Sequence, residues 1–425
     1  MKTNWRQRRA QRNDFPCAAL PTFPAKTLKA AAPRTPSQTR ARLRCALLCL
    51  SVLVFSAAAW ADPVQLRPAR SLMVGGVAMD VGDYAIPCAT DWNGDGRKDL
   101  IVGYRYADKL ALFLNSGTDA QPVFTSWSNL QVAGADIYVA GSGCGAPAPW
   151  VCDYDADGKR DLLVGSGADG RVHFFRNTNS DAQPVLAAGV PLKVGAADLS
   201  VSSRATPHVH DWDEDGRNDL LCGAGDGLVY LFRNVGTPQA PAYPAAVQLQ
   251  AGGLALNLGI RSVVRVFDWD GDGRKDLVAS STAGVYWCRN TGSNSAPVLQ
   301  AAVALRSPVS GSGLVPINTG PRMRLDLSDW NNDGVIDLLL GNADGRVFLY
   351  EGYRLAFSES RCLAGGMISL RWDSADYLKF HVLAGPTLTN IQSIVATNLP
   401  SEGQTTCWSN SIIGGQQFYR VQIAP

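Results

Sequence analysis

Short runs of Val, Leu, Phe and Tyr alternate with Gly, Asp and Asn along most of this chain of 425 residues. Apolar runs of this length, bounded by turn-forming residues, are typical of antiparallel β-strands. The segments DLLVG at residues 161–165 and VYLFRN at residues 229–234 are examples. The 42 Gly and 24 Pro indicate many turns rather than long helices. We therefore expect an all-β protein.

One acidic segment of ten residues occurs five times. The copies begin at Asp91 (DWNGDGRKDL), Asp153 (DYDADGKRDL), Asp211 (DWDEDGRNDL), Asp268 (DWDGDGRKDL) and Asp329 (DWNNDGVIDL). Each belongs to a longer unit that opens on a Pro, namely Pro63, Pro122, Pro184, Pro241 or Pro297. A unit predicts about four antiparallel strands, and so small a sheet buries its faces only by stacking on its neighbours. Repeated four-stranded sheets are the blades of a β-propeller, so residues 62–352 predict five blades.

The acidic segment has the pattern of a calcium-binding loop. Side-chain oxygens stand at positions 1, 3, 5 and 9, position 7 can add its backbone carbonyl, and Gly at position 6 lets the chain curl round an ion. The predicted ligands are Asp91, Asn93, Asp95, Arg97, Asp99, Asp153, Asp155, Asp157, Lys159, Asp161, Asp211, Asp213, Asp215, Arg217, Asp219, Asp268, Asp270, Asp272, Arg274, Asp276, Asp329, Asn331, Asp333, Val335 and Asp337. The alternative is that these segments are ordinary exposed Asp-Gly turns. Five copies with the same spacing of side-chain oxygens favour calcium binding, with up to five Ca²⁺ ions.

Two other positions of the loop narrow its interpretation. Position 12 holds an apolar residue or Cys222 where an EF-hand needs an acid, which excludes an EF-hand. Position 2 is always aromatic, and these side chains are expected to point away from the ligands and to pack between blades. They are Trp92, Tyr154, Trp212, Trp269 and Trp330.

The unit resembles the FG-GAP/VCBS repeat, the calcium-loop blade of integrin α-chain amino-terminal propellers and of many secreted bacterial proteins. The resemblance covers residues 62–352. The glycyl-alanyl-prolyl part is absent after the loops, where GSGADG (165–170) or GAGDG (223–227) stands instead. This departure favours the secreted bacterial branch of the family. The resemblance implies that the Ca²⁺ ions are mainly structural and join strand ends at the rim of each blade.

The first 61 residues differ in charge from the rest. They carry 11 Lys or Arg and one acid, Asp14, and an apolar run at 45–55 leads into small residues that end at Ala61. This layout predicts a signal peptide, residues 1–61, that is cleaved after Ala61; an uncleaved membrane anchor is the alternative. The mature chain then has 28 basic and 36 acidic residues. We expect a secreted, periplasmic or cell-surface protein with no nucleic-acid partner and no membrane span in the mature chain.

Residues 353–425 lie outside the repeats. Alternating patterns at 368–372, 377–385 and 418–424 predict a small β-sandwich, which weakly resembles fibronectin-III-like carboxy-terminal modules. Seven cysteines remain in the mature chain, so at least one has no intramolecular partner. Cys362 and Cys407, alone in this last segment, can pair there, whereas Cys222 and Cys288 lie in apolar strand patterns and are expected to be buried thiols.

None of the candidate catalytic motifs in the sequence fits its context. The Gly pattern at 165–170 lies in a turn between strands, and His208 and His210 are expected to be packed or surface histidines. The segment 104–106 (YRY) suits a recognition surface or an ordinary exposed turn. We therefore expect a non-enzymatic calcium-binding propeller that mediates adhesion to an extracellular protein or glycan. The alternatives are a carbohydrate-active enzyme of the polysaccharide lyase type, which would need His, Tyr, Lys or Arg clustered at one end of the channel, and a purely structural envelope protein.

Overall fold

The computed structural model describes residues 63–139, 145–355, 357–363, 367–386, 391–411 and 418–424, without the side chain of Cys362. The predicted signal peptide lies outside the described residues. Within those ranges the regular structure consists of β-strands, and no helix occurs. The all-β prediction is confirmed.

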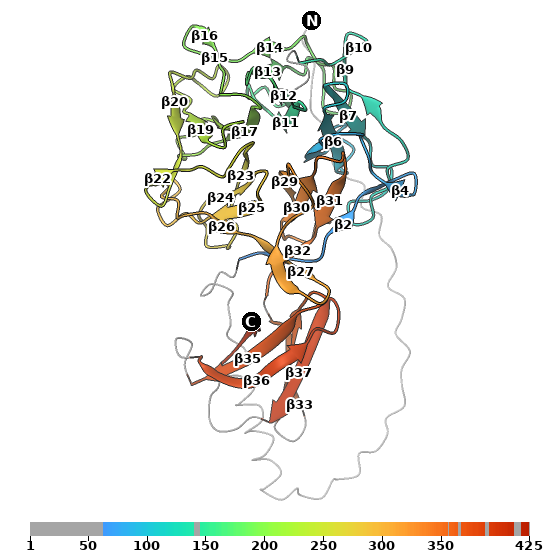
Figure 1. Ribbon diagram of the computed structural model, residues 1–425, viewed down its shortest axis with the longest axis vertical. Helices are drawn as coiled ribbons and strands as arrows, with labels where there is room; N and C mark the ends of the chain where they lie inside the picture. Colours follow the sequence, from blue (N-terminus) through green and yellow to red (C-terminus); the bar gives the residue numbers. More distant parts are fainter. Residues whose placement is uncertain are drawn as a thin grey trace, which may run out of the picture. The chain divides into compact units, whose positions relative to one another are not determined.

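Five four-stranded antiparallel sheets follow one another round a central axis (Figure 1). Their innermost strands are β5 (Ile86–Thr90), β11 (Ala148–Cys152), β17 (Thr206–His210), β23 (Val263–Phe267) and β29 (Arg324–Ser328). Each of these strands contacts the next, and β29 contacts β5, so the ring is closed. The fold is a five-bladed β-propeller, as predicted.

The remaining strands of the blades lie progressively further from the axis. The second strands are β6 (Asp99–Tyr104), β12 (Asp161–Gly165), β18 (Asp219–Gly223), β24 (Asp276–Ser280) and β30 (Asp337–Gly341). The third strands are β7 (Lys109–Phe113), β13 (Val172–Phe175), β19 (Val229–Phe232), β25 (Val285–Cys288) and β31 (Val347–Tyr350). The outer strands are β8 (Ser128–Asn129), β14 (Val190–Pro191), β20 (Ala246–Gln248), β26 (Val303–Ala304) and β2 (Arg70–Ser71).

The blades are out of phase with the repeating unit of the sequence. Each sheet begins at the strand before an acidic loop, and its outer strand comes from the beginning of the next unit. The fifth blade has no following unit, and β2 of the first unit pairs with β31 in its place. Nearby, β1 (Gln65–Leu66) pairs with β32 (Gly352–Tyr353), and Arg70 forms an ion pair with Glu351 at 2.9 Å. The ring is therefore closed by strands from both ends of the repeat region.

Short hairpins join each outer strand to the next blade. They are β3 (Met73–Val74) with β4 (Val77–Ala78), β9 (Gln131–Val132) with β10 (Ala135–Asp136), β15 (Lys193–Val194) with β16 (Ala197–Asp198), β21 (Gln250–Ala251) with β22 (Leu254–Ala255), and β27 (Arg306–Val309) with β28 (Gly313–Pro316).

The second strands explain the recurring apolar run after each acidic loop. Every residue of β12, β18, β24 and β30 is buried, because a blade has neighbours on both of its faces. The aromatic residues at loop position 2 pack between blades, as predicted. Trp212 lies in one cluster with Val264 and Leu277 of the next blade, and Trp330 lies with Leu100 of the first.

The glycine that ends most second strands makes room for the neighbouring backbone. A Cβ on Gly165 would lie 1.9 Å from the carbonyl oxygen of Ala205 in the next blade, so no larger residue fits without movement. The fourth blade has Ser280 at this place, and its hydroxyl donates to the Met323 carbonyl at 3.1 Å. Close contact between neighbouring blades therefore depends on glycine at this position, or on a serine that hydrogen-bonds to the next blade.

Residues from 357 onward form two three-stranded antiparallel sheets. One contains β33 (Phe357–Leu363), β34 (Met367–Asp373) and β37 (Thr405–Ser411), and the other β36 (Ser393–Pro400), β35 (Lys379–Gly385) and β38 (Phe418–Ile423). Their shared core includes Trp372 and Phe380, which is the predicted sandwich-like module. β33 and β37 flank β34 on opposite sides, and Cys407 is a free thiol, so the disulfide considered above does not form.

Candidate metal centres

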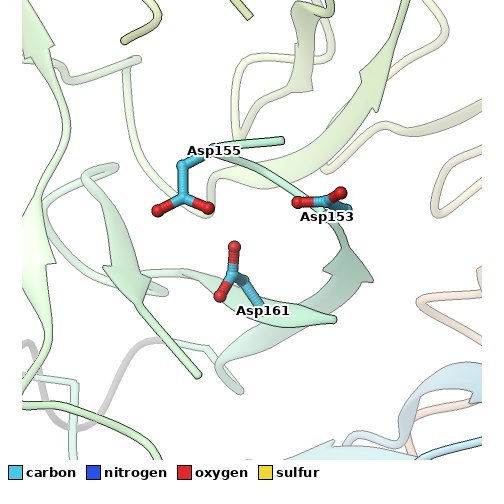
Figure 2. Close-up of side chains that lie close together, drawn as sticks. All are labelled: Asp153, Asp155 and Asp161. Carbon is cyan, nitrogen blue, oxygen red and sulfur yellow. The ribbon is translucent and has the colours of Figure 1, made fainter. Parts of the chain in front are cut away.

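The five acidic loops connect each innermost strand to the second strand of the same blade. In the second, third and fourth blades the carboxylates at positions 1, 3 and 9 converge, with one oxygen of each lying within 4.8 Å of the others. Figure 2 shows the group in the second blade, where Asp153, Asp155 and Asp161 point toward one another. The equivalent groups are Asp211, Asp213 and Asp219, and Asp268, Asp270 and Asp276. Three of the five predicted loops thus bring three carboxylates together.

The aspartate at position 9 holds each loop in place. In the third blade, Asp219 accepts the backbone N–H of Trp212 at 3.2 Å and that of Asn234, at the end of the third strand, at 2.7 Å. Both bonds recur in the other blades, with Asp99, Asp161, Asp276 and Asp337 as acceptors. This buried carboxylate therefore connects the loop to its own sheet.

Burial also changes the acidity of these carboxyl groups. Desolvation raises the pKa of all five position-9 aspartates to about 6, and the backbone hydrogen bonds oppose that rise only in part. The five are Asp99, Asp161, Asp219, Asp276 and Asp337. A cation next to each group would favour its charged form.

Position 1 shapes the turn, and position 5 lies on its outer side. The two oxygens of Asp211 accept the backbone N–H groups of Asp215 and Gly216 at 3.1 and 3.0 Å. Asp215 in turn accepts the backbone N–H and the guanidinium group of Arg217. The same arrangement recurs with Arg97 and Arg274, and Lys159 replaces arginine in the second blade. In the first four blades the position-7 side chain thus neutralises position 5, whereas Val335 of the fifth blade offers only its backbone N–H to Asp333. In the second, third and fourth blades, positions 1, 3 and 9 form the group.

The first and fifth blades have an amide at position 3. The amide nitrogens of Asn93 and Asn331 donate to Asp95 and Asp333 at 2.9 Å. The amide oxygen of each asparagine is therefore the one atom that can serve as a ligand at position 3. These two loops therefore carry one carboxylate fewer than the other three.

An arginine that the sequence reasoning missed accompanies each position-3 aspartate. Arg176 Nε lies 2.7 Å from Asp155 Oδ2, Arg233 Nη1 lies 2.7 Å from Asp213 Oδ2, and Arg289 Nε lies 2.6 Å from Asp270 Oδ2. The corresponding residues of the first and fifth blades are Leu114 and Glu351. The signal was the dipeptide Arg-Asn directly after three third strands, where the arginine follows the position-3 aspartate by 19 to 21 residues.

The donor set fits a hard divalent cation. All the side-chain donors are oxygens, as Ca²⁺ prefers. Asp155 Oδ1 and Asp213 Oδ1 are buried and accept no hydrogen bond from the described residues. A buried carboxylate oxygen without a donor is costly, and a cation in the group would satisfy it. The three groups can therefore hold a metal ion.

Polar and aromatic side chains of four innermost strands contact one another across the blades. They are the third residues of these strands. The ring centroids of His208 and Trp150 lie 4.4 Å apart, the guanidinium carbon of Arg265 lies 4.6 Å from the centre of the Trp150 ring, and Arg265 Nε donates to Asp326 at 2.6 Å. His208 Nε2 accepts the N–H of Val266 at 3.1 Å, and burial lowers the pKa of this histidine well below its ordinary value. His208 is thus a packed residue, as predicted.

The fold and the loops together define a class: a five-bladed β-propeller with an acidic, metal-binding-type loop in every blade. Residues 211–279 match the FG-GAP-like repeat family. The Xenopus laevis protein integrin alpha-4 is 30% identical over 138 residues, which cover 29% of this chain and 13% of that relative. An FG-GAP-like repeat is thus present at residues 211–279, and part of the chain is similar to an integrin α chain, which supports the resemblance to FG-GAP repeats.

Several solved structures have distant similarity to this chain. A fructofuranosidase from Schwanniomyces occidentalis is 9% identical, with a TM-score of 0.36, over 78% of this chain and 72% of that one. An Agrocybe aegerita lectin that recognises non-reducing terminal N-acetylglucosamine is 15% identical, with a TM-score of 0.33, over 83% and 96%. The Photorhabdus luminescens Tc holotoxin pore is 13% identical, with a TM-score of 0.36, over 76% and 16%.

Among the described residues no helix is long and apolar enough to cross a membrane.

Proposed function

We propose that the protein is a secreted or cell-surface calcium-binding propeller of the bacterial type that binds an extracellular protein or glycan without catalysing a reaction. The ions are structural and occupy up to five blade loops. The observation that carries the metal assignment is the convergence of three carboxylates in each of three loops, with buried oxygens of Asp155 and Asp213 that no described donor reaches. The binding role is supported by the likeness to integrin alpha-4 over part of the chain.

The calcium assignment is tested by titrating Ca²⁺ into chelator-treated full-length protein and measuring the heat. We expect saturable binding at up to five sites, with the groups around Asp155, Asp213 and Asp270 among them. Asp213→Asn should weaken one site. Glu214→Gln is the matched control, because Glu214 is an exposed residue of the same loop and lies outside the group. Binding that is absent, or that both variants weaken equally, would contradict the assignment.

The binding role is tested on an array of glycans and matrix proteins, probed with the full chain in calcium and in chelator. A ligand bound only in calcium is expected, because ordered loops hold the blade ends on which binding surfaces form. Silence on every ligand in both conditions would favour a purely structural envelope protein instead.

One observation keeps a carbohydrate-active enzyme as a second candidate. Arg204, Arg261 and Arg324 line a pocket together with Tyr84. Arginine can neutralise the carboxylate of a uronate sugar, and tyrosine is a possible proton acceptor in elimination. Incubation with uronate polysaccharides would reveal a lyase by the ultraviolet absorbance of its unsaturated product. No absorbance change is expected under the leading proposal.

A further inference from the structure

The end of the channel opposite the acidic loops is lined by arginines. All five innermost strands run toward an acidic loop, so their first residues meet at the other end. The residue two places before each of these strands is Tyr84, Ala146, Arg204, Arg261 or Arg322 in turn, and Arg324 opens β29. We call Arg204, Arg261, Arg322 and Arg324 the arginine mouth. Four positive charges thus come from three neighbouring blades.

The backbone at this place is strained in a repeated way. Tyr84, Arg204, Arg261 and Arg322 have φ angles of 55°, 49°, 67° and 65°. This left-handed region suits glycine and is unfavourable for a residue with a bulky side chain. Glycine is common at other turns of this chain, yet four of the five repeats carry a large polar side chain here. Because the same strained conformation recurs at equivalent positions, we infer that these large side chains have a function there.

The arginines are close enough to act on one another. Arg324 is buried, and its Nη1 donates to the backbone carbonyl oxygens of Arg261 at 2.7 Å and Met323 at 3.1 Å. Burial, followed by the charges of the other three guanidinium groups, lowers the pKa of Arg324 to about 9. Like charges gathered in a partly desolvated place repel, and an anion between them would relieve that repulsion.

The ring of Tyr84 packs against guanidinium groups of the arginine mouth. The guanidinium groups of Arg322 and Arg105 lie 4.2 Å from the centre of its ring, and that of Arg261 lies at 5.9 Å. Arg105 also donates to Asp83 at 2.7 Å, so its charge is already matched. Cation–π contacts fix the planes of the guanidinium groups and lower the entropy cost of binding a ligand.

A pocket is present at this point. It is lined by Arg204, Thr206, Arg261, Arg324 and Tyr84, together with Ile86 and small residues. A carboxylate or sulfate group fits the forked geometry that guanidinium groups offer. We propose that the arginine mouth is a binding site for a single oxyanion group, a carboxylate or a sulfate. This inference goes beyond the calcium role and does not depend on it.

The test is calorimetric titration of the full chain in calcium with sodium sulfate and sodium acetate at constant ionic strength, with chloride as the reference anion. Saturable heat is expected for at least one of the two oxyanions, and the stronger one identifies the preferred group. Arg204→Gln and Arg261→Gln should each weaken binding roughly tenfold, as for loss of one charged hydrogen bond, because both arginines line the pocket. Arg306→Gln is the matched control, because Arg306 is an exposed arginine of the β27 strand.

Heat that matches chloride for both anions would overturn the proposal, as would an equal loss of affinity in Arg306→Gln. Circular dichroism of each variant checks that it is folded, since sulfate also stabilises proteins generally. Calcium content is measured on the same samples. A protein that binds sulfate but no calcium would contradict the proposed function alone, whereas one that binds calcium but neither oxyanion would contradict this inference alone.

Discussion

The acidic loops of the three middle blades differ from those of the first and fifth blades by one charge and by the residue that balances it. The middle loops have aspartate at position 3 and an arginine from the third strand against it, as in the pair of Asp213 and Arg233. The outer two have Asn93 or Asn331 at position 3, with Leu114 or Glu351 where the arginine would stand. Each of the three loops with aspartate at position 3 is therefore accompanied by an arginine that contacts that aspartate. The residue at position 3 and its partner from the third strand thus differ together between the two types of loop.

Removal of calcium should have the largest effect on the molecule. A site held at 100 times its Kd contributes about 2.7 kcal/mol to folding, and the middle loops offer three such sites. Chelation is therefore expected to lower Tm by on the order of 10 °C. Differential scanning calorimetry in calcium and in chelator measures the shift. An unchanged Tm would contradict structural calcium in every blade.

The next largest effect is expected from Asp219→Asn in the third blade. The amide puts a donor where the carboxylate accepts backbone N–H groups from both Trp212 and Asn234, so a buried N–H loses its acceptor. The expected loss is about 1–3 kcal/mol in chelator and more in calcium. Urea unfolding measures it. Glu214→Gln, an exposed change in the same loop, should stay within about 0.5 kcal/mol of the parent.

The first loop can be given the residues of the middle loops, aspartate at position 3 and arginine after the third strand, to test whether these two residues act as a pair. Asn93→Asp alone adds a carboxylate beside Asp91 and Asp95 and should destabilise the protein in chelator by roughly 0.5–1 kcal/mol through repulsion. Leu114→Arg in the same chain should offset that loss. A double-mutant cycle in urea isolates the coupling. Equal stability of all four proteins would mean that the two residues do not act as a pair.

The smallest effect is expected from Arg233→Gln. Its guanidinium group is about half exposed, so the pair with Asp213 contributes only about 0.2–1 kcal/mol. The loss should be larger in chelator than in calcium, because a bound ion balances Asp213 by itself. Chemical unfolding under both conditions tests this order, and the reverse order would contradict it. Arg306→Gln, a change at an exposed arginine outside the acidic loops, serves as the neutral comparison.

The sequence predicted the blade count, the position of the loops and the aromatic packing, because each is a local pattern repeated five times. The closing strand β2 was missed because Arg70 and Ser71 carry no periodic signal of their own. The partners of position 3 were missed for another reason: Arg233 lies 20 residues after Asp213, and only strand pairing brings them together. The arginine mouth joins residues about one repeat apart, which are neighbours only in a closed ring.

Closure by β2 has a consequence for the time at which the propeller can form. The ion pair that accompanies it joins Arg70 to Glu351, 281 residues later in the chain. At the ordinary rate of synthesis, about 5–20 residues per second, Arg70 waits roughly 15–60 s for its partner. During that interval the blades already made form an open arc with an unpaired edge, which invites pairing with other chains. The edge stays available for such pairing until the last blade is complete.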